Sequence, residues 1–204
     1  MTTRGNYSTG ELAIYPGPAE APEVPEPRQP WYAYRADLLD DWTALSALRL
    51  AAERRLREGH IEQWTDTARG LDQLAFFTAR EEMYLVREKN TAIGCFALSS
   101  WADPDFWHDD PERDECLYLY KVMTAPWMAH QGVGRFMVNF AMEEARERKC
   151  TALRLDCWRE NKRLHERWQN LGFTKLRTVT LPSRNSGTLM EMRLMSRLAG
   201  DDRG

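Results

Sequence analysis

The spacing of hydrophobic positions along the chain distinguishes the expected helices from the expected strands. Apolar side chains that recur every three or four positions predict amphipathic helices over 43–58 and 136–148. Further helices are expected over 71–79 and, between two capping residues, over 162–170. Short runs of aliphatic, β-branched and aromatic residues predict strands, over 83–88, 92–99, 117–124, 152–158, 174–181 and 188–194. The stretch 101–116 is expected to be a long loop, because it contains two prolines and several acidic residues.

The order of these elements predicts the fold class. A strand, helix and strand in succession, as in 117–158, require a parallel pair with a right-handed crossover. Lys89 and Asn90 join two strand-like runs as an antiparallel hairpin. We therefore expect an α/β (α+β) fold, in which a single domain has one mixed central β-sheet with helices on both faces.

Polar residues in the amphipathic elements are expected opposite the apolar face. In the first helix, this second face carries Arg49, Glu53, Arg54 and Arg57. In the strand 152–158, Arg154, Asp156 and Trp158 alternate with Leu153, Leu155 and Cys157. The helix 162–170 has Asn161 as its expected N-cap and Gly172 as its C-cap.

A pair of glycines, Gly132 and Gly134, stands between a strand-like run and a helical pattern. A strand that leads through glycines into a helix exposes backbone N–H groups at the positive end of the helix dipole, and these groups bind phosphate. Outside other context such a pair is as often only a tight turn. Spacing excludes a dinucleotide fingerprint, which needs a small residue at Met137, and a P-loop, which needs lysine at Arg135.

Composition narrows the class of partner. The 204 residues include 28 basic and 31 acidic side chains, so the net charge of −3 indicates neither a nucleic-acid partner nor a membrane partner. The N-terminus lacks a signal-peptide pattern, and Cys95, Cys116, Cys150 and Cys157 form no Cys-x-x-Cys pair, so a cytoplasmic location is expected. Residues 1–30, rich in proline and acid, are expected to form a flexible arm, followed by one domain over 31–198 and a loose tail over 199–204.

Several short motifs occur in a fixed order. Pro126 precedes Gly132-Val133-Gly134 by six residues, the strand 153–158 is followed by Asn161, and Leu171-Gly172-Phe173 closes the second helix. In this order and spacing the chain, from about 45 to 194, resembles the GNAT superfamily of acyl-CoA-dependent N-acyltransferases. The resemblance implies a GNAT-like domain in which the central parallel strands splay apart at a bulge. It also allows a homodimer through the last strands.

The resemblance further implies that acetyl-CoA is the co-substrate and that no metal takes part. Backbone contacts to the pantetheine arm and thioester would come from Val122, Met123 and Thr124. Contacts to the pyrophosphate would come from Gln131, Gly132, Val133, Gly134 and Arg135, with Asn161 and Trp168 at the coenzyme positions of the second helix. The chemistry agrees, because a diphosphate needs backbone donors, a peptide-like arm needs a free strand edge, and a thioester needs an oxyanion donor.

Two positions depart from the family pattern. Ala129 stands where the family usually has arginine or glutamine, for which Gln131 and Arg135 can compensate. Trp168 stands where the family usually has a tyrosine that protonates the departing thiolate, a role indole cannot fill. A thiolate with a pKa of about 8.5 can take its proton from water, and a general acid contributes about 10²–10⁴ in rate. Trp168 therefore either packs against the coenzyme arm or core, or marks a protein that binds acyl-CoA without efficient turnover.

The acceptor amine must lose a proton, because an alkylamine with a pKa of about 10.4 is protonated at pH 7. The candidate bases, each of which could equally be structural, are Glu115, Tyr118, Tyr120 and Asp156. Cys157 could be a nucleophile, but its place in an alternating strand favours a buried structural thiol. The histidines, His60, His108, His130 and His165, lack metal-ligand spacing.

An acceptor site is expected among the loop 101–116, the first helices and the final hairpin. Its candidate substrate-binding residues are Trp64, Trp101 and Trp107. With the acidic residues Asp103, Asp105, Asp109 and Asp110, these indoles suggest a wall for a cationic or amine-bearing small molecule, although a solvated acidic loop fits the pattern equally.

The leading hypothesis is acetyl transfer to a primary amine of a small molecule, a metabolite or an antibiotic, by direct attack on the thioester. The alternatives are acetylation of a protein lysine or N-terminus, and a non-catalytic acyl-CoA sensor.

Overall fold

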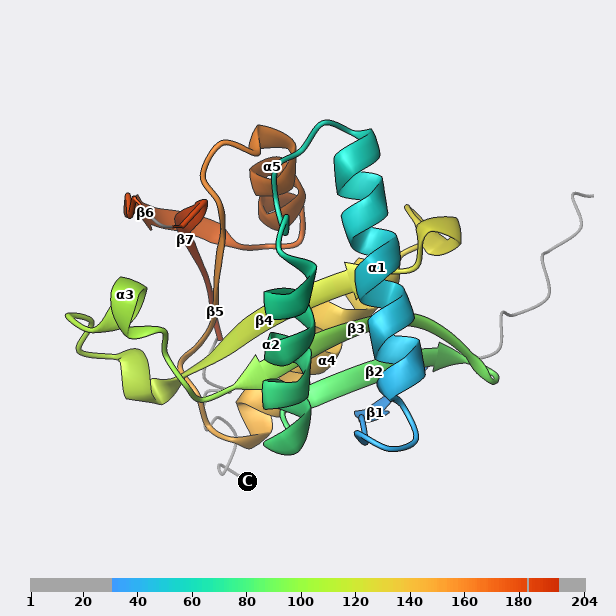
Figure 1. The fold of residues 1–204 in the computed structure, drawn as a ribbon. Helices are drawn as coiled ribbons and strands as arrows, with labels where there is room; N and C mark the ends of the chain where they lie inside the picture. The colour runs from blue at the N-terminus through green and yellow to red at the C-terminus, as the bar shows by residue number, and fades with distance from the viewer. Residues whose placement is uncertain (1–30, 183, 195–204) are drawn as a thin grey trace, which may run out of the picture.

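Seven strands form one sheet within residues 31–182 and 184–194, which the computed structural model describes (Figure 1). The strands are β1 (Tyr32–Arg35), β2 (Met83–Glu88), β3 (Thr91–Ser99), β4 (Cys116–Thr124), β5 (Ala152–Trp158), β6 (Thr174–Thr178) and β7 (Ser186–Arg193). Their order across the sheet is β1-β2-β3-β4-β5-β7-β6. The expected arm 1–30 and tail 199–204 lie outside the described residues.

Helices cover both faces of this sheet. They are α1 (Trp42–Glu58), α2 (Thr67–Ala79), α3 (Pro104–Trp107), α4 (Val133–Glu147) and α5 (Lys162–Asn170), with short 3₁₀ turns at Arg113–Glu115 and Pro126–Met128. In Figure 1, α1 and α2 lie in front of the sheet and α4 lies behind it. β4 and β5 are parallel and every other neighbouring pair is antiparallel, which confirms the predicted mixed sheet.

Several element boundaries differ from the predictions. β1 was not expected, because its four residues are too few to show a period, yet it pairs with β2 from Tyr32↔Arg87 to Arg35↔Tyr84. α2 begins at Thr67, before the first apolar repeat, because the side chain of Asp66 accepts a hydrogen bond from the backbone N–H of Arg69 at 3.0 Å.

The other differences lie in the loop and at the final hairpin. The expected loop 101–116 contains α3 and a 3₁₀ turn, because proline suits the first position of a helix and the Asp103 side chain caps α3. The final strands are displaced, since β6 ends at Thr178 and β7 already begins at Ser186. The predicted N-cap of α5 is confirmed, because Asn161 caps its first turn. The C-cap is Leu171, one residue before the predicted Gly172, which follows it with φ of 103°.

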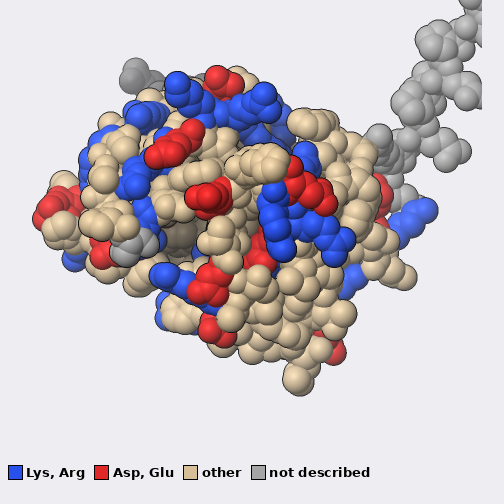
Figure 2. Space-filling model, turned by 45° about the horizontal axis from the view of Figure 1, so that its top comes forward, with Lys and Arg blue, Asp and Glu red and all other residues tan. Residues whose placement is uncertain are grey.

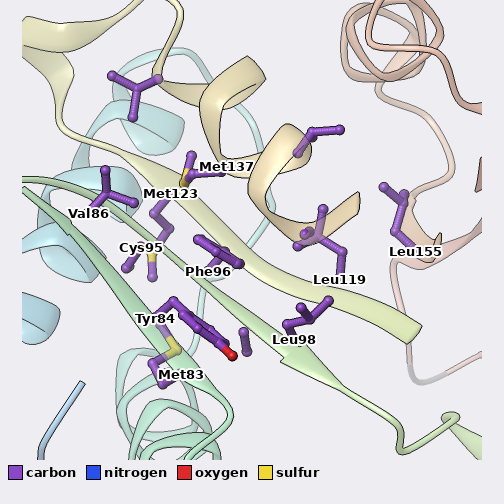
Figure 3. Close-up of a cluster of buried hydrophobic side chains, with 14 of the residues drawn as sticks. Met83, Tyr84, Val86, Cys95, Phe96, Leu98, Leu119, Met123, Met137 and Leu155 are labelled. Carbon is purple, nitrogen blue, oxygen red and sulfur yellow. The ribbon is translucent and has the colours of Figure 1, made fainter. Parts of the chain in front are cut away.

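The main core lies between β2, β3, β4 and the buried face of α4 (Figure 3). Tyr84 and Phe96 stack with ring centroids 5.1 Å apart, and Phe140 from α4 meets both rings edge-on. Met123 from β4 and Met137 from α4 complete this layer. The core therefore fixes the start of α4 against the end of β4, the two elements that frame the glycine turn.

Three charged residues that the pattern assigns to polar faces are buried instead. Arg49 and Glu53 of α1 form an ion pair with Nε 2.6 Å from Oε1, and Thr67 donates to the other oxygen of Glu53 at 2.6 Å. Arg154 of β5 is 2% exposed and pairs with Glu191 at 2.8 Å and Asp110 at 3.1 Å. The prediction was wrong at these positions because α2 and the loop before β4 add a second layer over them.

Candidate active site

The central strands β4 and β5 separate halfway along their length. Their pairing ends at Tyr118↔Arg154, although β4 continues to Thr124 and β5 to Trp158. The separation coincides with a bulge, where the pairing of β3 with β4 shifts and Lys121 has φ of 52°. This confirms the expected splay, which leaves the edge of β4 from Leu119 to Thr124 without a partner in β5.

A cleft of about 1210 Å³ opens from this splay. Its walls come from α1, α2, the ends of β4 and β5, the start of α4 and one side of α5. Val122, Met123 and Thr124 line it along β4, and Gly132 through Arg135 line it at the glycine turn. The structure thus brings together residues from both predicted parts of a coenzyme site.

The glycine turn places a helix start at one end of this cleft. Gly132 has φ of 96°, a conformation that favours glycine, and α4 begins at the next residue. Gly134 is buried against α5, since a Cβ there would lie 3.0 Å from Nη2 of Arg167. The first backbone N–H groups of a helix have no intrahelical acceptor, so this turn offers donors to an anion. Gln131 donates its side-chain amide to the carbonyl of Trp127 at 2.8 Å.

Arginines from three helices, α1, α4 and α5, line the cleft near this turn. Arg135 reaches α5, with Nη2 3.5 Å from the carbonyl oxygen of Asn170. Burial and the neighbouring charge of Arg55 lower the pKa of Arg167, which means that an anion at this place would be stabilised by both cations. The sequence reasoning missed Arg55 and Arg167, because α1 and α5 meet only in the folded chain.

Asn161 and Trp168 line the same cleft from α5. The side-chain oxygen of Asn161 accepts a hydrogen bond from the backbone N–H of Leu164 at 3.0 Å, so it caps the helix. Trp168 is 8% exposed and meets Phe173 edge-on at 5.4 Å. Its Nε1–H has no hydrogen-bond partner among the residues that the structure describes. A buried donor without an acceptor beside a cleft indicates a place for a ligand acceptor.

The four candidate bases separate into two groups. Glu115 is exposed in a 3₁₀ turn and Tyr118 is fully buried, donating to the carbonyl of Arg113 at 3.0 Å, and neither lines the cleft. Burial raises the pKa of Tyr118 to about 12. Tyr120 and Asp156 do line the cleft, on β4 and β5 respectively.

Tyr120 and Asp156 are both shifted toward their neutral forms. Burial, and then the charge of Asp156, raises the pKa of Tyr120, whose hydroxyl donates to the carbonyl of Trp101 at 2.9 Å. Burial raises the pKa of Asp156, while a hydrogen bond from Ser186 opposes that shift. Asp156 is therefore the carboxylate candidate that lines the cleft, and its raised pKa makes it a better proton acceptor than a solvated carboxylate.

Lys121 is a cleft residue that sequence reasoning missed. Burial and the charge of Arg49 lower its pKa to about 8, and its ammonium donates to Oε1 of Gln73 at 2.6 Å. The only sequence signal was its place in the apolar run of β4. Cys157 also lines the cleft, but its side chain is buried and its pKa is raised to about 12 by burial, in agreement with a structural thiol.

The structure separates the three candidate substrate-binding tryptophans. Trp64 and Trp101 line the cleft. Trp107 is fully buried outside it, packed on Tyr118 at 5.5 Å and below the guanidinium of Arg154 at 5.0 Å. Trp107 belongs to a second core cluster. It therefore holds the segment 101–116 against the sheet and does not form part of the cleft wall.

The acidic loop is largely paired with arginines. Arg184 lies 2.6 Å from a carboxylate oxygen of Asp103 and 2.9 Å from one of Asp105. Arg154 forms an ion pair with Asp110. In the part of the chain that the structure describes, no group of three or more histidine, cysteine or acidic residues could hold a metal ion. The helices described there are all too short or too polar to cross a membrane.

Comparisons with known proteins agree with this geometry. Residues 24–173 match the model of the acetyltransferase (GNAT) family. The chain is 24% identical over 140 residues to the uncharacterized N-acetyltransferase YesJ of Bacillus subtilis, which covers 66% of this chain and 77% of that protein.

Solved structures share the fold. A GNAT-family acetyltransferase from Listeria monocytogenes superposes with a TM-score of 0.68 at 20% identity, covering 80% of this chain and 95% of that one. The PaiA N-acetyltransferase of Thermoplasma acidophilum, solved with coenzyme A, has a TM-score of 0.62 at 16% identity, with 81% and 99% covered. A putative acetyltransferase, YncA, of Salmonella typhimurium, solved with acetyl-CoA, has a TM-score of 0.55 at 17% identity, with 84% and 98% covered. With its splayed sheet and its match over 24–173, the chain belongs to the GNAT family and is an acyltransferase.

Proposed function

We propose that this protein transfers an acetyl group from acetyl-CoA to a primary amine of a small molecule. The observation that carries the proposal is the unpaired edge of β4, from Leu119 to Thr124, which leads to the glycine turn at the start of α4. A strand edge and a helix start in one cleft offer backbone groups to a peptide-like arm and to a diphosphate.

The described residues fit the coenzyme at three places. Backbone N–H groups at Val133, Gly134 and Arg135 would hold the diphosphate, with Arg167 beside them. The edge of β4 would hold the pantetheine arm. The buried Nε1–H of Trp168 offers an unused donor within the same cleft. When bound, acetyl-CoA supplies an acyl group activated as a thioester.

The chain's own residues would prepare the amine. Asp156 lines the cleft on β5, and burial raises its pKa, so it is a stronger proton acceptor than a solvated carboxylate. Tyr120, whose hydroxyl is held by the carbonyl of Trp101, would shape the wall beside it. A small acceptor is supported by the burial of the charged groups in the cleft, since burial is the largest cause of the pKa shifts of Lys121 and Asp156.

Trp168 favours one alternative, a sensor that binds acyl-CoA without efficient turnover. The hydroxyl that would protonate a departing thiolate is replaced by an indole, which can donate a hydrogen bond but no proton. Water can supply that proton, and therefore catalysis remains the leading proposal.

The test combines binding and turnover. Calorimetry with acetyl-CoA measures binding, and release of free thiol across a panel of primary amines measures transfer. Gly134→Glu would place a carboxylate in the anion cradle, and we expect binding at least about 10-fold weaker. Asn139→Glu, on the exposed side of the same helix, is the matched control and should bind as the parent protein does.

Three results separate the alternatives. Binding with thiol release for small amines supports the proposal. Tight binding without release for any small amine or peptide supports the sensor, and release with peptides alone supports a protein acetyltransferase. If acetyl-CoA gives no binding heat and Gly134→Glu leaves any activity unchanged, the coenzyme site is assigned incorrectly.

A further inference from the structure

Two opposite charges face the acceptor side of the cleft without a partner of opposite sign. We propose that the acceptor is an amino acid with a large apolar side chain, whose carboxylate binds Lys121 and whose amine is directed to Asp156. This inference rests on the proposed function, since it names the acceptor class of the same site.

The bulge in β4 brings Lys121 into the cleft. Successive side chains of a regular strand point to opposite faces, but Lys121 has φ of 52° and follows Tyr120 onto the same face. Tyr120 stacks on Phe77 at 5.4 Å, and the ammonium of Lys121 donates to Gln73 at 2.6 Å. Because Gln73 and Phe77 are one turn apart on α2, both β4 side chains face that helix.

The ammonium group of Lys121 has no carboxylate partner among the described residues. Within residues 31–182 and 184–194, no carboxylate lies at ion-pair distance from its ammonium group. The other cations nearby that face an acid are already paired, Arg49 with Glu53 and Arg184 with Asp103. The lowered pKa of Lys121, about 8, agrees with a site that lacks its counter-charge and still leaves the group protonated at pH 7.

Asp156 holds the opposite charge across the splay. It lies on β5 beyond the last paired residues, and among the described side chains its hydrogen bond comes from Ser186 while no basic group forms an ion pair with it. Lys121 and Asp156 each affect the pKa of the other, yet they form no direct ion pair. An amino acid carries an ammonium and a carboxylate on one carbon, so it can neutralise both buried charges at once.

Aromatic rings continue from these charges to the mouth of the cleft. Ring centroids are 5.3 Å apart for Phe76 and Phe77, 5.4 Å for Phe77 and Tyr120, and 6.1 Å for Tyr120 and Trp101. Phe76 is 49% and Trp101 42% exposed, although both are large and apolar. Such a wall favours a large apolar side chain. Figure 2 shows one face of the molecule, on which both acidic and basic groups occur and basic groups gather along the upper edge.

The experiment compares matched acceptors. The probes are L-leucine, L-methionine, L-phenylalanine and L-tryptophan, each beside its primary amide and its decarboxylated amine. Binding is measured by calorimetry in the presence of coenzyme A, and kcat/KM by thiol release from acetyl-CoA. For at least one of the four, we expect the amino acid to bind at least about 10-fold more tightly than its amide and amine.

Lys121→Met then identifies the group that reads the carboxylate. Methionine keeps most of the lysine's length, and we expect it to remove the preference for the acid while binding of the decarboxylated amine changes less than about 2-fold. Lys121→Arg should restore part of the preference. Lys175→Met, an exposed lysine of β6, is the control and should retain the parent pattern. Thermal unfolding of each variant excludes a folding defect as the cause.

The possible outcomes distinguish a failure of this inference from a failure of the proposed acetyl transfer. If thiol is released from acetyl-CoA with amines but acids and amides are used equally, the inference is overturned while the proposed function stands. A preference for the amides also overturns it and directs attention to peptide N-termini, which the amides resemble. No binding of acetyl-CoA and no release with any amine would overturn both.

Discussion

Replacing Lys121 tests whether its buried ammonium group lowers the free energy of unfolding of the protein. Burial and the charge of Arg49 lower the pKa of this ammonium from 10.5 to about 8, against the opposing pull of Asp156. Below pH 8 the group is protonated in both states, so folding carries the full cost of the buried charge. As the pH rises from 8 to 10.5, Lys121 loses its proton in the folded state before it does so in the unfolded state. The free energy of unfolding therefore increases over this range.

The size of the effect follows from the two pKa values. A tenfold change in proton affinity corresponds to about 1.36 kcal/mol, so the interval from 10.5 to about 8 gives an upper bound of about 3 kcal/mol. Because Lys121 lines an open cleft, solvent reduces this value, and we expect about 1–2 kcal/mol. Lys121→Met should therefore be more stable than the parent protein at pH 7, with the difference shrinking by this amount toward pH 10.

Urea unfolding at pH 7, 8.5 and 10 measures this change for the parent protein, Lys121→Met and Lys175→Met. The comparison within each pH cancels the titration of the groups whose pKa Lys121 does not affect. The exposed Lys175 is the control, and its variant should differ from the parent by a constant amount. A difference for Lys121→Met that stays constant from pH 7 to 10, or grows with pH, would refute the burial of a charged lysine in the cleft.

Three further changes test other parts of the structure. Glu53→Ala leaves the buried guanidinium of Arg49 unpaired and should lower the free energy of unfolding by about 3–5 kcal/mol in urea; a loss below 1 kcal/mol would contradict the burial of this pair. Gly187→Ala adds a Cβ that overlaps the carbonyl oxygen of Val179 at φ of 148°, so thermal unfolding should show a loss of at least about 2 kcal/mol, and an unchanged melting temperature would exclude that close approach. Trp168→Tyr replaces the indole of a residue that lines the cleft by a phenol that can protonate the thiolate, and should raise kcat by up to about 10²-fold; an unchanged kcat would show that water already protonates the thiolate.

Local periodicity was sufficient for most of the elements. The period of the apolar residues predicted α1 and α4, because each helix buries one apolar stripe, whereas the capping residues Asn161 and Gly172 predicted α5. It failed for β1 and α3, which are too short to show a period and depend on pairing with β2 and on the Asp103 cap. The glycine turn was predictable for a different reason, since the backbone at Gly132 needs a conformation that glycine adopts readily.

The catalytic candidates show the limit of such reasoning. Four candidate bases were chosen from neighbouring positions, but the fold places Tyr120 and Asp156 on the cleft and keeps Glu115 and Tyr118 away from it. A strand's alternation would separate Tyr120 from Lys121, and only the bulge turns both to one side. The orientation of Lys121 could not be predicted from neighbouring residues, because the bulge depends on how β3 pairs with β4.

The sequence by itself determined the order of helices and strands, the parallel pair at the centre of the sheet and the glycine turn that begins α4. The tertiary structure alone decided that Arg49, Glu53 and Arg154 are buried, that Arg55 and Arg167 meet at the turn, and that Lys121 faces the cleft. The reason is physical: a residue's secondary structure reflects neighbours within a few positions, whereas its burial and charge partners depend on segments that only folding brings together.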